Sequence, residues 1–137
     1  MVQLVERIRD NPFFLVLENA GEIIGFSSAY TERDLRDLDF EKDQIAQHIL
    51  SKSSNFVYWD QIGIINQFQN RIAAGRLMDA FLQDSNLHDY SSVWGAVCHF
   101  PRKNNQAIRL AQAKKFELEE EISAYNGLIF GIYRRQI

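Results

Sequence analysis

The stretch with the clearest chemical potential runs from Asp60 to Leu82, DQIGIINQFQNRIAAGRLMDAFL. A strand pattern ends near Ile65, a short loop follows, and a helical pattern begins near Ile72. The polar residues of the loop and the small residues of the helix start are Gln69, Asn70, Arg71, Ala73, Ala74 and Gly75. The first N–H groups of a helix lack internal partners, and the helix dipole favours an anion there. Small side chains would let a phosphate reach this backbone, so the stretch predicts a phosphate-binding site.

Two better-known phosphate motifs are absent from the chain. It contains neither GxxxxGK[ST], the P-loop, nor GxGxxG, the dinucleotide-binding fingerprint. The alternative interpretation is an ordinary helix start whose alanines serve packing. The stretch alone leaves both interpretations open.

Other reactive side chains give weaker signals. Cys98 and His99 are adjacent, and neighbouring strand residues point to opposite faces, which argues against a nucleophile–base pair. His48, His88 and His99 do not have metal-ligand spacing with Cys98. No metal site is predicted.

The elements that must position these residues follow from periodicity and turn signals. Turns at Asn19-Ala20-Gly21 and Tyr125-Asn126-Gly127 predict two hairpins. Thr31 with Asp34 resembles a capping box, and Asn104 is a candidate N-cap. The pattern predicts the end of a helix over Val2–Arg9, strands over Phe13–Leu17, Glu22–Ala29, Phe56–Ile65, Val93–Phe100, Phe116–Ala124 and Leu128–Ile137, and helices over 34–50, from Ile72 and from Asn104. This order predicts an α/β or α+β domain with a mixed sheet flanked by helices.

Composition bounds the class of protein. A length of 137 residues fits a single domain over 1–137. The net charge of −3 gives no basic footprint, so nucleic acid is not an expected partner. No apolar run approaches the ~18 residues of a membrane span, and the N-terminus lacks a signal-peptide core. With one cysteine, Cys98, and therefore no disulfide framework, we expect a soluble cytoplasmic protein without membrane partners.

A second stretch, from Asn104 to Phe116, carries a family resemblance. It reads NNQAIRLAQAKKF and resembles the late helix of the GNAT acetyltransferases, N-x-x-A-x-x-L-Y-x-x-x-G-F. Four residues match in register: Asn104, Ala107, Leu110 and Phe116.

The loop after Ile65 resembles the pyrophosphate motif of the same superfamily, Q/R-x-x-G-x-G/A. Gln69, Ile72 and Ala74 fall on its defining positions. The resemblance extends over almost the whole chain from Val2 onward. It implies the acyl-CoA N-acyltransferase fold, in which the central sheet is mixed and mostly antiparallel.

Several positions depart from the family pattern. Ile72 replaces the first glycine of the phosphate motif, and Lys115 replaces the glycine before the late phenylalanine. Ala111 stands where a tyrosine often protonates the departing thiolate, so the usual general acid is missing. The short N-terminus predicts that the usual first strand and first helix are also missing.

The resemblance implies a mechanism in which an amine attacks the thioester of acetyl-CoA directly. The arm of this acyl donor would lie along Ile62, Gly63 and Ile64, and Asn104 would touch it. Its pyrophosphate would lie on the loop and helix start, Gln69, Asn70, Arg71, Ile72, Ala73, Ala74 and Gly75. Asp60 is the candidate general base, with a structural carboxylate as the alternative. Tyr58, Tyr90 and Tyr125 could supply the acid, and nothing in the sequence selects among them.

Three functions therefore remain open. The chain is an N-acetyltransferase for an unidentified amine, a non-catalytic acyl-CoA-binding domain, or a pseudoenzyme used for protein contact. A missing first strand would also leave the apolar strand Phe13–Leu17 at an exposed sheet edge. A homodimer that covers this edge is the corresponding expectation.

Overall fold

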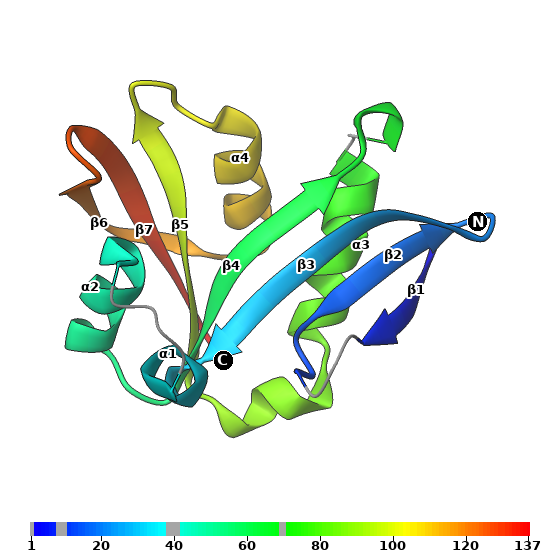
Figure 1. The fold of residues 1–137 in the computed structure, drawn as a ribbon, viewed down its shortest axis with the longest axis horizontal. Coiled ribbons are helices and arrows are strands. Elements are labelled where there is room, and N and C mark those ends of the chain that lie inside the picture. Colours follow the sequence, from blue (N-terminus) through cyan, green and yellow to red (C-terminus); the bar gives the residue numbers. More distant parts are fainter. Residues whose placement is uncertain (1, 8–10, 38–41, 69–70) are drawn as a thin grey trace. The chain divides into compact units, whose positions relative to one another are not determined.

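The computed structural model describes residues 2–7, 11–37, 42–68 and 71–137 (Figure 1). The chain divides into two compact units. The first comprises Met1–Ala29 and Asp60–Asp89, and the second comprises Tyr30–Trp59 and Tyr90–Ile137. One strand, Phe56–Ile64, passes from the second unit into the first at Asp60.

The described strands and helices confirm a mixed α/β class with a mostly antiparallel sheet. In chain order they are β1 (Val2–Arg7), β2 (Leu15–Asn19), β3 (Glu22–Thr31), α1 (Glu32–Asp37), α2 (Gln44–Lys52), β4 (Phe56–Ile64), η1 (Asn66–Phe68), α3 (Arg71–Leu82), η2 (Ser85–Asp89), β5 (Ser92–Phe100), α4 (Asn105–Ala113), β6 (Glu117–Ala124) and β7 (Leu128–Gln136). The strand order is β1-β2-β3-β4-β5-β7-β6. The β4–β5 pair is parallel, whereas the pairs β1–β2, β2–β3, β5–β7 and β6–β7 are antiparallel.

The two predicted hairpins are present, and their turns have the backbone that the sequence demands. Ala20 and Gly21 have φ values of 52° and 83° between β2 and β3. Asn126 and Gly127, at 57° and 100°, lie between β6 and β7. A tight hairpin turn needs positive φ at its central residues, which asparagine and glycine adopt most readily.

The N-terminal prediction is wrong. Residues Val2–Arg7 form strand β1 instead of the end of a helix, and they pair antiparallel with β2. Val2 faces Asn19 and Leu4 faces Leu17 across the ladder. The backbone hydrogen bonds of a neighbouring strand thus override a local pattern that favoured a helix.

The pairing of β1 also corrects the expectation of an exposed edge. β2 is flanked by β1 on one side and β3 on the other, so it does not present the open edge on which the homodimer was expected. A strand lies ahead of the first hairpin, where we expected the first strand to be missing. The oligomeric state is not tested by this geometry.

The core of the first unit is built by α3 and the strands beside it (Figure 1). Leu77 and Phe81 of α3 are fully buried, which confirms the predicted apolar stripe of this helix. The Phe13 ring meets the Phe81 ring edge-on, with centroids 5.7 Å apart and planes at 77°. Leu15 and Leu17 of β2 are equally buried.

Gly25 of β3 marks a close approach to β4 and α3. A Cβ atom at this position would lie 2.6 Å from Ile64 Cδ1, 2.9 Å from the Gly63 carbonyl oxygen and 3.5 Å from Leu77 Cδ1. The backbone oxygen cannot move aside as a side chain can, so only glycine fits here.

The core of the second unit lies between its short helices and its strands. Its buried members include Leu35, Ile45, Ile49, Phe56, Tyr58, Trp94 and Ile132. The predicted single helix over 34–50 is two helices, α1 and α2, and residues 38–41 lie outside the described part. The Asp43 side chain accepts a hydrogen bond from the Ala46 N–H at 2.9 Å and so caps α2.

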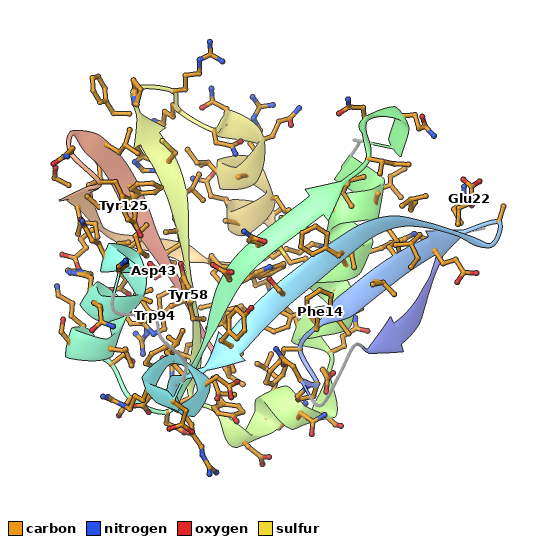
Figure 2. All side chains as sticks on the ribbon, in the orientation of Figure 1. Phe14, Glu22, Asp43, Tyr58, Trp94 and Tyr125 are labelled. Atoms are coloured by element: carbon orange, nitrogen blue, oxygen red, sulfur yellow. The ribbon has the colours of Figure 1, made fainter. Side chains whose placement is uncertain are left out.

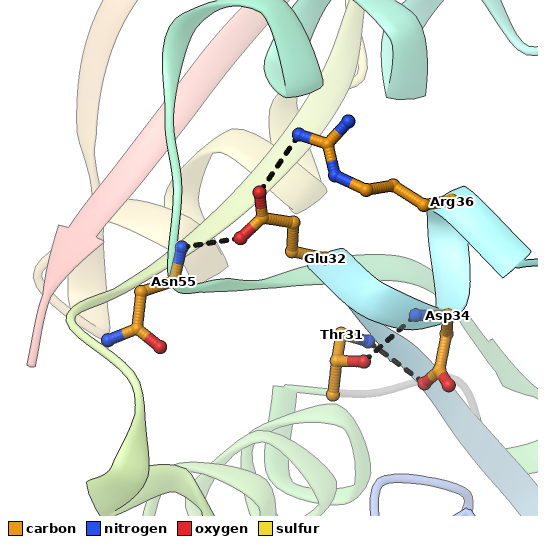
Figure 3. A network of polar contacts seen from close by, with 5 residues as sticks. All are labelled: Thr31, Glu32, Asp34, Arg36 and Asn55. Atoms are coloured by element: carbon orange, nitrogen blue, oxygen red, sulfur yellow. Dashed lines mark hydrogen bonds and ion pairs between the residues drawn. The ribbon is translucent and has the colours of Figure 1, made fainter.

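The predicted capping box at the start of α1 is confirmed (Figure 3). The Thr31 N–H donates to Asp34 Oδ2, and the Asp34 N–H donates to Thr31 Oγ1, both at 3.1 Å. These reciprocal bonds satisfy two N–H groups that the helix leaves without internal partners.

Glu32 joins α1 to the residue that precedes β4 (Figure 3). The Asn55 N–H donates to its Oε1 at 2.8 Å, and Arg36 Nη2 donates to its Oε2 at 2.9 Å. These bonds, the Asn55 bond first, lower the pKa of the Glu32 carboxyl from its ordinary value. Stabilisation of the charged form is therefore stability of the fold.

None of the described helices is long and apolar enough to cross a membrane.

Replacing Gly25 with alanine should destabilise the fold by about 1–3 kcal/mol, because the added methyl group overlaps the Gly63 carbonyl. Gly95→Ala is the control, since its Cβ would lie 3.8 Å from the nearest atom, the Trp59 carbonyl oxygen. Urea unfolding measures both variants. Equal stability of the two variants would show that β4 can shift away from the added methyl group without loss of stability.

Glu32→Gln should reduce the free energy of unfolding at neutral pH by about 1 kcal/mol, because a charge-assisted bond is lost. The folded pKa lies below the unfolded value, so this contribution is full above the unfolded pKa and disappears as pH falls through the folded pKa. The difference between wild type and variant should therefore narrow in acid. Arg36→Gln, which keeps the Asn55 bond, should remove only part of the pH-dependent difference. Parallel stability–pH curves for wild type and Glu32→Gln would contradict this account.

Candidate cofactor-binding site

The strand end of the candidate site is the last part of β4, in the first unit. Ile62 is exposed, whereas Asp60, Gly63 and Ile64 are half-buried. Gly63 was expected to admit a ligand, and the structure shows that a ring from the neighbouring strand already lies against it. A Cβ at Gly63 would stand 2.6 Å from Cε1 of Phe26.

The backbone groups of β4 alternate between its two edges. The Gly63 carbonyl faces β3, as its closeness to Gly25 shows, and the Ile65 N–H donates to the Ile24 carbonyl at 2.9 Å. Successive residues of an extended strand direct these groups to opposite edges. The backbone groups of Ile62 are therefore directed away from β3, where they can meet a ligand.

The helix start of the candidate site is the first turn of α3, which begins at Arg71. Ala73 and Gly75 are buried, Ala74 is half-buried, and Ile72 is 67% exposed. Two predicted residues, Gln69 and Asn70, lie outside the described residues. Small residues therefore occur at this helix N-terminus, the kind of position that suits a phosphate, but only Ala74 among them is partly exposed, and the most exposed side chain is Ile72.

Asn104 lies in the second unit and acts as the predicted N-cap of α4. Its Oδ1 accepts a hydrogen bond from the Ala107 N–H at 3.1 Å. Its own N–H donates to the Cys98 carbonyl at 3.0 Å. The structure thus gives Asn104 a capping role, and a contact with the acyl donor stays a prediction.

The candidate acids differ in their surroundings. Tyr58 is buried in the core of the second unit, and Tyr90 is half-buried. The Tyr125 hydroxyl donates to Asp43 Oδ1 at 3.0 Å and accepts from the Gln44 N–H at 3.1 Å (Figure 2). Burial and the Asp43 carboxylate raise the pKa of Tyr125. Its proton is committed to Asp43, which disfavours Tyr125 as the acid.

A network of polar side chains that the sequence did not indicate lies on the strands of the second unit. His99 Nε2 is 2.9 Å from the Tyr133 hydroxyl, and its Nδ1 is 3.3 Å from Glu121 Oε1. The imidazole lies over Gly131, where any side chain would collide with it. Burial, followed by the Glu121 charge, raises the pKa of Tyr133. Only the register of β5, β7 and β6 brings these residues together, so no sequence spacing could reveal this network of contacts.

The thiol neighbour of His99 is not part of this chain of contacts. Cys98 Sγ donates instead to the Phe100 carbonyl at 3.4 Å. In the part of the chain that the structure describes, no group of three His, Cys, Asp or Glu side chains could hold a metal ion.

Two departures from the family pattern lie in α4 and directly after its end. Ala111, at the position of the usual tyrosine, is only 6% exposed, and its carbonyl accepts from the Phe116 N–H at 2.9 Å. Lys115, at the position of the usual glycine, has a φ of 67°. This is the left-handed residue that ends a helix, where glycine carries no Cβ penalty.

Comparisons with known proteins agree with this architecture. No protein-family model and no curated protein matches the chain. YncA from Salmonella typhimurium, solved with acetyl-CoA, is 15% identical with a TM-score of 0.63, over 90% of this chain and 63% of its own. A protein from Desulfovibrio desulfuricans assigned to the GNAT family is 14% identical with a TM-score of 0.65, over 90% and 68%. Polyamine N-acetyltransferase from Drosophila melanogaster is 11% identical with a TM-score of 0.67, over 91% and 75%.

The chain therefore has the fold of the GNAT acetyltransferases, as the two sequence motifs predicted. At these identities the comparisons define the fold. They do not identify the acyl donor, the acceptor or the reaction of this chain.

Lys115→Gly should stabilise the fold by about 0.5–1 kcal/mol, because glycine adopts the left-handed conformation without strain. Lys114→Gly is the matched control, since Lys114 has a φ of −95° and offers no strain to relieve. That control should be neutral or destabilising. Thermal and urea unfolding of the two variants measure the difference. Equal effects on stability would show that the backbone of Lys115 is not strained.

Proposed function

We propose that the chain binds acetyl-CoA and transfers its acetyl group to an amine. The observation that carries the proposal is the first turn of α3, which begins shortly after β4 and has the half-buried Ala74 beside the buried Ala73 and Gly75. A larger side chain at Ala74 would fill the space that a phosphate needs to approach the N–H groups. The shared fold with a structure that contains acetyl-CoA supports the same donor.

The residues of the first unit have separate roles in this proposal. The N–H groups of the first turn of α3 bind the pyrophosphate, with the helix dipole and the Arg71 and Arg76 charges in support. The backbone groups of Ile62 bind the arm, as in strand addition to a sheet edge. One N–H of this strand end polarises the thioester carbonyl.

The reaction is an acyl transfer without a covalent enzyme intermediate. A neutral amine forms the new C–N bond, the C–S bond breaks, the amine loses one proton and the thiolate gains one. We assign the first proton to Asp60, which lies on the same strand as the proposed arm contacts. The buried Ala111 leaves the second proton without its usual donor, so we expect slow transfer. In this proposal the protein is cytoplasmic, in keeping with its single cysteine.

The acceptor is proposed only as an amine. One structural neighbour forms N-acetylagmatine, so agmatine is a reasonable first compound to test. A panel of polyamines and protein N-termini extends the test. Release of free thiol upon addition of an amine distinguishes a transferase from a chain that only binds the donor.

Ala74→Leu should weaken acetyl-CoA binding at least about tenfold, because the larger side chain blocks the approach of a phosphate to the helix start. Ala80→Leu is the control on the same helix, since Ala80 is also half-buried but lies near the other end. Isothermal calorimetry gives both affinities, and melting curves without ligand show whether each variant is folded.

The wild-type protein should also melt at a higher temperature in millimolar acetyl-CoA, because the ligand binds only the folded state. No shift in melting temperature and no calorimetric heat would refute the proposed function. Equal loss of affinity in the two leucine variants would place the pyrophosphate elsewhere.

A further inference from the structure

The Phe26 ring closes one face of β4 at Gly63. A Cβ built at Gly63 would lie 2.6, 3.2 and 3.3 Å from Cε1, Cδ1 and Cζ of Phe26, so the ring occupies the space of a side chain. Gly63 is adjacent to Ile62, whose backbone groups face away from β3. The ring therefore stands beside the strand segment that we propose as the site of the thioester.

A second ring holds Phe26 in place. The Phe14 ring stacks on it with centroids 6.1 Å apart and planes at 16° (Figure 2 labels Phe14). Phe26 also faces Val16 across the β2–β3 ladder, and Val16 is buried. Both rings are half-buried, so part of their surface can contact a ligand. Displacement of the Phe26 ring would therefore disturb this stack.

The two faces of β3 have different neighbours. Gly25 faces Leu77 of α3, and Phe26, the next residue, points to the opposite face. The proposed pyrophosphate site is the first turn of α3. In the proposed function the donor extends from this turn along β4, where the Phe26 ring lies against Gly63.

We propose that Phe26 is a specificity-determining residue that limits the acyl group of the donor to about two carbons. This inference rests on the proposed function, because it assumes an acyl-CoA along β4. An acetyl methyl group contacts the ring, whereas a longer chain must displace the ring from Gly63 and from Phe14. The protein therefore discriminates against acyl donors of four or more carbons.

The test compares CoA, acetyl-CoA, butyryl-CoA and hexanoyl-CoA by calorimetry on the wild-type protein and Phe26→Ala. Truncation of the ring should improve the affinity for hexanoyl-CoA relative to acetyl-CoA at least tenfold and leave the affinity for CoA unchanged. Ile23→Ala is the control. Ile23 lies on the same strand and is 60% exposed, and its truncation should leave the ratio as in wild type. Phe26→Leu replaces Phe26→Ala if the smaller residue does not fold.

The possible failures can be distinguished. An unchanged ratio of hexanoyl-CoA to acetyl-CoA affinity in a folded Phe26 variant overturns the inference, although the proposed function survives. Tight hexanoyl-CoA binding by the wild-type protein overturns it as well. Absence of binding of both CoA and acetyl-CoA to the wild-type protein overturns the proposed function and the inference together.

Discussion

The close approach of β3 and β4 at two glycines is the constraint on which the first unit depends. Gly25 lets the carbonyl of Gly63 and the side chain of Leu77 come near on one face. Gly63 lets the Phe26 ring lie against β4 on the other face. A neighbouring group thus occupies the space beside each glycine, and packing on both faces fixes the strand end that leads to α3.

This constraint fixes the strand end that leads to the proposed binding site. The large apolar side chains that anchor α3, Leu77 and Phe81, are buried in the second half of the helix, and its first turn adds only the small buried Ala73 to the core. Ile72 is 67% exposed, so its side chain adds little to that core.

The sequence predicts those features that depend on local chemistry. The turn at Ala20-Gly21, the capping box of Thr31 and Asp34, and the N-cap Asn104 follow from backbone requirements that few residue types satisfy. The fold is predicted from two short motifs, at 69–74 and 104–116, because they resemble two motifs that occur in this order in one superfamily.

Prediction from the sequence fails where the pairing of strands decides the structure. β1 is a strand because β2 lies beside it, and nothing in Val2–Arg7 alone reveals that partner. Gly63 is expected to admit a ligand, whereas the neighbour that the structure shows there, Phe26, follows only from the pairing of β3 with β4. The positions at 69 and 70, on which the phosphate motif depends, lie outside the described residues.

The acidic run Glu119-Glu120-Glu121 shows the same limit in the second unit. Alternation along β6 directs neighbouring carboxylates of the run to different partners. Glu120 Oε1 lies 2.6 Å from His48 Nε2 and 2.7 Å from Lys52 Nζ, and these bonds, the Lys52 bond first, lower its pKa. Glu121 contacts His99. Such exposed pairs weaken in salt and contribute little stability, so the second unit depends mainly on its buried apolar core, as the first unit depends on the packing at its two glycines.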